Sequence, residues 1–138
     1  MKIGLDIHGV IDKYPDVFSD LSESWTEMGH EIHIITGQSW KRAREKVENA
    51  KISFHSHYSI VDYHRAHEDV DMWTDSTGNW WMPVEEWNKS KGVYCKESNI
   101  DIHFDDELQY AEYMPDTCTF VLVSKDSFLM PKLFQTRT

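Results

Sequence analysis

Residues 3–12 read IGLDIHGVID, and this stretch decides the fold that the rest of the sequence implies. A short apolar run reaches a carboxylate at Asp6 and then turns polar, which predicts a buried strand ending at Asp6. The run is too short for a signal peptide or a membrane span. We therefore expect a cytoplasmic protein with no membrane association.

Outward from this stretch, strand and helix patterns alternate. Apolar residues three or four apart predict a helix over 15–28, a second apolar run predicts a strand over 32–36, and Ser39 caps a further helix. The later pattern predicts these elements in chain order: a strand within 51–58, a hairpin over 73–82, a helix over 83–99 with a break near Gly92, a strand over 100–104, a helix that Pro115 stops, and a strand over 119–123.

Strands separated by helices pair in parallel through right-handed crossovers. The sequence therefore predicts an α/β fold, a Rossmann-like open parallel sheet flanked by helices on both faces. A chain of 138 residues can bury a core in one domain, so we expect a single domain over 1–138 with a small β-hairpin flap over 70–83.

The chain is acidic, with 14 Lys and Arg residues against 24 Asp and Glu residues and a net charge of −10. Broad binding to nucleic acid or to an anionic membrane needs a basic surface, so both partners are disfavoured, whereas a single small anion is not. The two cysteines, Cys95 and Cys118, are too few for a disulfide scaffold and suit a reducing compartment.

Polar residues follow three of the predicted strands: Asp6 after the first, Thr36 at the end of the second, and Asp105-Asp106 after the strand over 100–104. In a parallel sheet these ends share one edge, where ligands bind. Clustered carboxylates repel one another unless a cation lies between them. Mg²⁺ prefers such oxygen ligands together with a substrate phosphate, so the sequence predicts a magnesium site.

These residues resemble the four ordered motifs of the haloacid dehalogenase superfamily of phosphatases. The resemblance rests on residues 5–12, residues 34–37, a lysine ahead of a helical stretch and residues 102–106, and it spans most of the chain. It implies a fold of that type with a minimal cap. It also implies that Asp6 is the nucleophile that forms an aspartyl-phosphate, and that Mg²⁺ is held by Asp6, the backbone carbonyl of His8, Asp105 and Asp106.

The same resemblance requires a lysine that neutralises the phosphoryl group. Lys89, Lys91 and Lys96 are the candidates, and Lys91 is preferred because it precedes the helical stretch that leads to Asp105. The sequence departs from the family at His8, where the phosphatases carry an aspartate that serves as general acid and base. Histidine can perform both steps, so we predict His8 as the acid/base; lost activity is the alternative.

For substrate binding, the resemblance implies that Thr36 and the amides of Gly37 and Gln38 bind the phosphoryl oxygens. Four tryptophans lie in or beside the hairpin: Trp73, Trp80, Trp81 and Trp87. Exposed aromatics there, Trp73 and Trp81 above all, are predicted to stack on a base or sugar ring, although packing of the hairpin explains them equally well. A basic run, consisting of Lys41, Arg42, Arg44 and Lys46, is either a solvated helix face or a track for a nucleotide or polyphosphorylated tail.

The sequence leaves the roles of two further groups of residues open. One group consists of four histidines: His55, His57, His64 and His67. They are interpreted either as zinc ligands or as histidines at the surface or behind the site that bind no metal. The apolar residues of the tail over 125–138 can dock on the body of the protein or on a second subunit, and the oligomeric state is not predicted.

The sequence thus predicts a Mg²⁺-dependent phosphomonoesterase that acts on a small phosphorylated metabolite or nucleotide. A phosphotransferase and a nucleic-acid end phosphatase are alternatives within the same chemistry. A non-catalytic protein that binds a phosphorylated ligand, or serves in interactions on the same fold, is the alternative from a different class.

Overall fold

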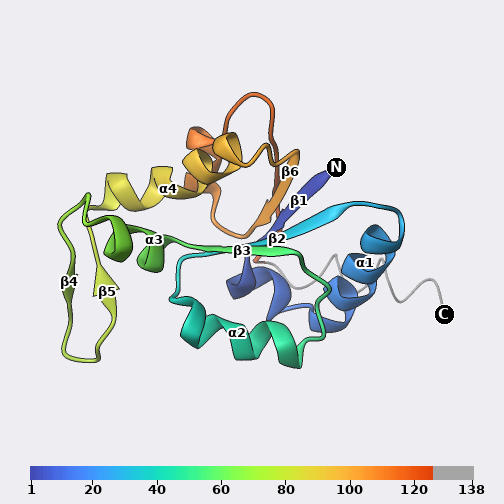
Figure 1. Ribbon diagram of the computed structural model, residues 1–138, viewed down its shortest axis with the longest axis horizontal. Coiled ribbons are helices and arrows are strands. Elements are labelled where there is room, and N and C mark those ends of the chain that lie inside the picture. The colour runs from blue at the N-terminus through green and yellow to red at the C-terminus, as the bar shows by residue number, and fades with distance from the viewer. Residues whose placement is uncertain (126–138) are drawn as a thin grey trace.

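In the computed structural model, which describes residues 1–125, five parallel strands form the central sheet in the order β3-β2-β1-β6-β7 (Figure 1). The strands are β1 (Lys2–Leu5), β2 (Glu31–Thr36), β3 (Ser56–Ser59), β6 (Ile102–Asp105) and β7 (Thr119–Leu122). The helices are α1 (Pro15–Glu27), α2 (Trp40–Asn49), α3 (Ile60–His67) and α4 (Val84–Glu97), with short helical turns η1 (Ile7–Ile11) and η2 (Leu108–Tyr113).

Strand β1 lies at the centre of the sheet because its residues pair on both sides. Leu5 is in register with Ile34 of β2 and with Phe104 of β6. The next amide, Asp6 N–H, donates to the carbonyl of Phe104 at 3.0 Å. This register brings the residues that follow β1 and β6 to one edge of the sheet.

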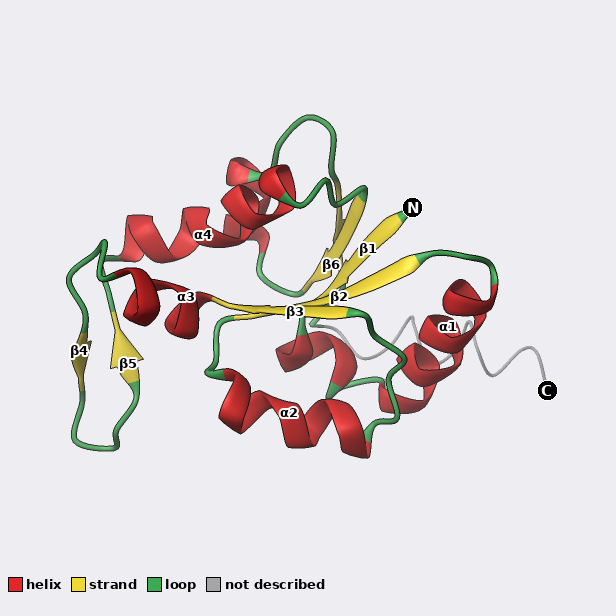
Figure 2. Cartoon of the chain, in the orientation of Figure 1, coloured by secondary structure: helices red, strands yellow, loops and turns green. Residues whose placement is uncertain are grey.

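Helices cover both faces of the sheet, with α1 and α2 on one side and α3 and α4 on the other (Figure 2). Successive side chains of a strand point to opposite faces of the sheet, so each face has its own hydrophobic core. Ile34 packs with Phe18 and Val47 on the side of α1 and α2. Ile35 packs with Tyr58 and Cys95 on the side of α3 and α4. The predicted open parallel sheet with helices on both faces is confirmed.

Beyond α3, the chain forms a two-stranded antiparallel ladder of β4 (Trp73–Thr74) and β5 (Trp80–Trp81), in which Trp73 is in register with Trp81. Its turn is held by Asp75, whose Oδ1 accepts from the amides of Thr77 and Asn79 at 2.9 and 3.1 Å. Figure 1 shows this hairpin projecting beyond the edge of the sheet next to α3 and α4. We call residues 73–81 the hairpin below.

Three expectations about elements were wrong. The third strand starts only at Ser56, and the segment after Asp106 is a six-residue 3-10 helix in place of an α-helix. Helix α4 does not break at Gly92. A Cβ there would overlap with the carbonyl oxygen of Tyr113, so this glycine permits close packing of α4 against η2.

Among residues 1–125, no helix combines the length and the apolar character that crossing a bilayer requires. Cys95 and Cys118 are both buried free thiols. The expectation for the apolar tail concerns residues 126–138, which lie outside the described part of the chain.

Candidate active site at the carboxyl edge of the sheet

The backbone turns sharply after β1, immediately beyond Asp6. His8 has φ −69° and ψ 123° and Gly9 has φ 76° and ψ −1°, which are the two central positions of a type II turn. That turn needs glycine at its second central position, and a Cβ on Gly9 would also overlap with the carboxylate of Asp106. Gly9 therefore lets the β1 turn lie directly against the residue that follows β6.

A buried lysine links the two central strands. Lys91 Nζ, from the middle of α4, lies 3.0 Å from Asp6 Oδ1 and 2.7 Å from Asp105 Oδ2. Only 2% of the Lys91 side chain is exposed. The other two candidate lysines do not reach the site, because Lys89 pairs with Glu86 at the surface and Lys96 is exposed.

Three hydrogen-bond donors contact the buried Asp105 carboxylate, one of which is Lys91. Its Oδ2 also lies 2.9 Å from His103 Nε2, and its Oδ1 accepts from the amide of Glu107 at 3.2 Å. Burial acts to raise the pKa of Asp105, but Lys91 and His103 outweigh it and hold that pKa below its usual value. Asp105 is therefore a fixed negative charge that holds Lys91 in position.

Asp6 has a different electrostatic balance from Asp105. Burial raises the pKa of Asp6 to about 8, and the neighbouring Lys91 only partly opposes this effect. The pKa of Lys91 is raised because the two carboxylates outweigh its own burial. Shifted carboxyl and amine groups that meet at the edge of a sheet are typical of functional sites.

Asp106 completes an acidic cluster that fits a divalent cation. One carboxylate oxygen from each of Asp6, Asp105 and Asp106 lies within 4.8 Å of the others. Asp106 Oδ1 is buried and has no hydrogen-bond partner, an arrangement that is unfavourable unless a ligand completes it. Hard oxygen donors and an unsatisfied buried acceptor suit Mg²⁺.

The end of β2 supplies the neutral part of the site. Thr36 is buried, and its Oγ1 accepts from the amide of Gln38 at 3.3 Å. Ser59 Oγ donates to the Gln38 carbonyl at 2.6 Å and holds this loop from β3. A Cβ on Gly37 would overlap with the ring of Trp87, so glycine is needed where the loop passes α4.

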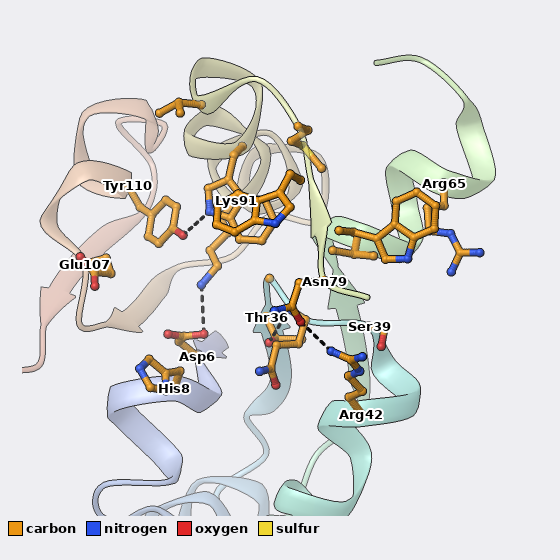
Figure 3. Close-up of a pocket in the computed structure, with 18 of the residues that line it drawn as sticks. Asp6, His8, Thr36, Ser39, Arg42, Arg65, Asn79, Lys91, Glu107 and Tyr110 are labelled. Atoms are coloured by element: carbon orange, nitrogen blue, oxygen red, sulfur yellow. Dashed lines mark hydrogen bonds and ion pairs between the residues drawn. The ribbon is translucent and has the colours of Figure 1, made fainter. Parts of the chain in front are cut away.

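These groups open into a cavity of about 950 Å³. We call its lining residues Asp6, Thr36, Lys91 and Asp106 the floor, and the remaining lining residues come mainly from α2, α3, α4, η2 and the hairpin. Figure 3 shows Asp6, Thr36 and Lys91 together. His8 also lines it; the His8 side chain is 79% exposed, with Nδ1 3.3 Å from Asp12 Oδ2.

The predicted binding residues divide into two sets. Thr36, Gly37, Gln38 and Trp81 line the cavity, whereas Trp73 is not among its lining residues. Several other lining residues, such as Arg65, Asn79 and Tyr110, were not predicted from the sequence. Their signal was absent because α3, the hairpin and η2 reach the site only through tertiary packing.

The histidines form no metal centre in the described residues, where the acidic cluster is the only group with suitable ligand geometry. His57 stacks on Trp40 with ring centroids 3.9 Å apart. His64 Nδ1 lies 2.8 Å from Asp69, and its Nε2 lies 2.8 Å from Ser90. The zinc interpretation therefore gains no support.

No model of a known protein family matches the sequence, and no curated protein matches it either. The function must therefore be argued from the chemistry of the site.

Proposed function

We propose that this protein is a Mg²⁺-dependent phosphomonoesterase with a fold of the haloacid dehalogenase type, and that it forms an aspartyl-phosphate on Asp6. One observation carries the proposal. A buried lysine bridges Asp6 and Asp105 at the carboxyl edge of a parallel sheet, beside an unpartnered buried oxygen of Asp106. A structural ion pair alone does not account for the third carboxylate or for the cavity above it.

In the proposed reaction, Asp6 Oδ2 attacks the phosphorus and the bond to the leaving oxygen breaks. Lys91 stays protonated, and with Thr36 and the amides after it this lysine neutralises and orients the phosphoryl oxygens. Asp6, Asp105, Asp106 and the His8 carbonyl would hold Mg²⁺, which stabilises the negative charge of the transferring group. Water then attacks the phosphorus of the aspartyl-phosphate, the bond between phosphorus and Asp6 Oδ2 breaks, and inorganic phosphate and the free Asp6 carboxylate result.

His8 is the proposed proton carrier. Its imidazole would donate a proton to the leaving oxygen and then accept one from the attacking water. Its exposure at the cavity favours this role, because an exposed ring can turn between Asp12 and the substrate. The hairpin, as a small flap over the cavity, suits a small phosphorylated metabolite or nucleotide.

The same exposure favours one other function, a non-catalytic protein that binds a phosphorylated ligand. His8 Nδ1 faces Asp12 in this structure, and it makes no hydrogen bond to any described residue of the acidic cluster. Binding without turnover in the presence of Mg²⁺ would support this alternative.

The test is phosphate release from p-nitrophenyl phosphate and from a panel of nucleotides and sugar phosphates. We expect release that requires Mg²⁺, stops in EDTA and is lost in Asp6→Asn. Asp20→Asn is the matched control, because Asp20 is an exposed carboxylate of α1 outside the cavity. Absence of release from every ester by folded, Mg²⁺-supplied protein would contradict the proposal, as would full activity in Asp6→Asn.

A further inference from the structure

The wall of the cavity carries a second group of cations, separate from Lys91. Lys41 and Arg42 come from α2 and Arg65 comes from α3, and all three line the cavity. In Figure 3, Arg42 and Arg65 lie beyond Thr36 when followed from Asp6. None of the three forms an ion pair with the acidic cluster, so the cavity has an acidic floor around one lysine and a separate basic wall.

From this arrangement we propose that the basic wall is a second anion subsite, and that the preferred ligand carries a second phosphate beyond the one that reaches Asp6. The inference rests on the proposed function, because it assigns the first phosphate to Asp6. It defines the substrate class as compounds with two phosphates on either side of a sugar, such as a nucleoside 3′,5′-bisphosphate.

The cations of the wall have no anionic partner among residues 1–125. Among the described residues, no carboxylate lies within 4.0 Å of the charged nitrogens of Lys41, Arg42 or Arg65, whereas Arg44 on the same helix pairs with Glu48 at 2.7 Å. This happens in a chain with a net charge of −10, in which carboxylates are abundant. Of the carboxylates that line the cavity, Asp6 and Asp106 belong to the floor, and Glu107 is paired with Lys125.

The two arginines are held in defined positions by the hairpin. Arg42 Nη1 donates to Asn79 Oδ1 at 2.8 Å, and the Arg65 guanidinium lies over the Trp80 ring at 4.5 Å. Asn79 is itself fixed, since its Nδ2 donates to Thr77 Oγ1 at 3.0 Å. A guanidinium that stacks through its face keeps the N–H groups of its edge for a ligand, and that planar edge matches phosphate oxygens.

The size and lining of the cavity also favour a ligand larger than a single phosphate ester. About 950 Å³ is near the upper end of the roughly 300–1,000 Å³ typical of small-molecule sites. Trp81 and Trp87 also line this space and offer aromatic surface for a sugar or base. A free bisphosphate and the phosphorylated end of an oligonucleotide share this chemistry, and the test below separates them.

Binding is measured by calorimetry with Asp6→Asn protein and Mg²⁺, so that the result does not depend on turnover. We expect adenosine 3′,5′-bisphosphate to bind at least tenfold more tightly than adenosine 5′-monophosphate. In the Arg42→Gln/Arg65→Gln double variant this ratio should fall to about one. Arg44→Gln, an exposed residue of α2 outside the cavity, should keep the ratio of the parent protein.

Because both arginines contact the hairpin, Lys41→Gln is tested as well; it should lower the ratio without removing a hairpin contact. A 5′-phosphorylated dinucleotide that binds more tightly than the free bisphosphate would support the second subsite and assign its phosphate to a strand end. Equal affinities for bisphosphate and monophosphate would overturn the inference, as would a preference that survives in the double variant and in Lys41→Gln. Phosphate release without this preference defeats the inference alone, whereas selective binding without any release defeats only the proposed function.

Discussion

Replacing Lys91 with methionine should destabilise the protein by about 3–5 kcal/mol, the usual consequence of removing one partner from a buried ion pair. Lys91 is 2% exposed and contacts two buried carboxylates, so its loss leaves Asp6 and Asp105 without their shared cation. Methionine nearly preserves the volume of the side chain, which keeps the cavity contribution small. At about 2–4 °C for each kcal/mol, the melting temperature should fall by roughly 6–20 °C.

The assay is thermal and urea unfolding in EDTA, with Lys89→Met as the matched control on the same helix. Lys89 forms a solvent-accessible pair with Glu86, so its replacement should leave the stability close to that of the wild type. Added Mg²⁺ should raise the melting temperature of Lys91→Met more than that of the wild type, because three carboxylates then lack an internal cation. Equal stabilities of Lys91→Met and Lys89→Met would refute the reasoning.

Three further outcomes are expected. Burial raises the pKa of Asp6 from 3.8 to about 8, so between these values the folded protein holds a proton that the unfolded chain releases. In EDTA the stability of the wild type should therefore fall as the pH rises from 5 to 8, and that of Asp6→Asn should fall less; parallel stability curves would count against the shift. His8→Ala should slow hydrolysis of an alkyl phosphate by about 10²–10⁴-fold but affect p-nitrophenyl phosphate much less, because nitrophenolate leaves without a proton. Equal losses in kcat for the two esters would argue against a role as general acid. Gly92→Ala should destabilise the protein by about 1–3 kcal/mol in urea, because the Cβ meets the Tyr113 carbonyl, even though alanine favours helix by about 1 kcal/mol. Unchanged or increased stability would show that α4 and η2 can move apart without destabilising the protein.

The fold was largely predictable because its strands carry a simple local signal. Short apolar runs that end in polar residues marked β1, β2 and β6, and parallel pairing then brought Asp6 and Asp105 to one edge. The less regular elements gave a weaker signal. The strand pattern over 51–58 begins in the connection before β3, where Ile52 and Phe54 pack on the core without belonging to a strand. The 3-10 helix η2 is too short to establish a helical period.

The sequence favoured Lys91 for a reason that was wrong, because this lysine was expected ahead of a helical stretch and instead lies in the middle of α4. Lys89, Lys91 and Lys96 lie on one helix, and the usual rule assigns charged residues to its solvent face. Helix α4 instead buries three consecutive residues, Ser90, Lys91 and Gly92. Gly92, which was expected to break the helix, is the residue that lets η2 approach α4 closely.

The basic wall was also only partly visible in the sequence. Arg42 belonged to a basic run that a solvated helix face explains equally well, and Arg65 carried no signal. Arg42 and Arg65 line the same cavity because α2, α3 and the hairpin lie together beyond the end of β2, where Arg42 donates a hydrogen bond to Asn79. Such contacts depend on how the elements pack in three dimensions, which the hydrophobic period and the spacing of motifs in the sequence do not reveal.

The most direct test of the central claim is to trap phosphate on Asp6. Protein mixed with substrate and Mg²⁺ is quenched in acid during turnover, reduced with borohydride and mapped by mass spectrometry, since an acyl phosphate is reduced to an alcohol while a free carboxylate is not. The account predicts homoserine at position 6 only when substrate and Mg²⁺ are both present, and no modification in Lys91→Met that has lost activity. Turnover that leaves position 6 unmodified, or that modifies another residue, would contradict the account.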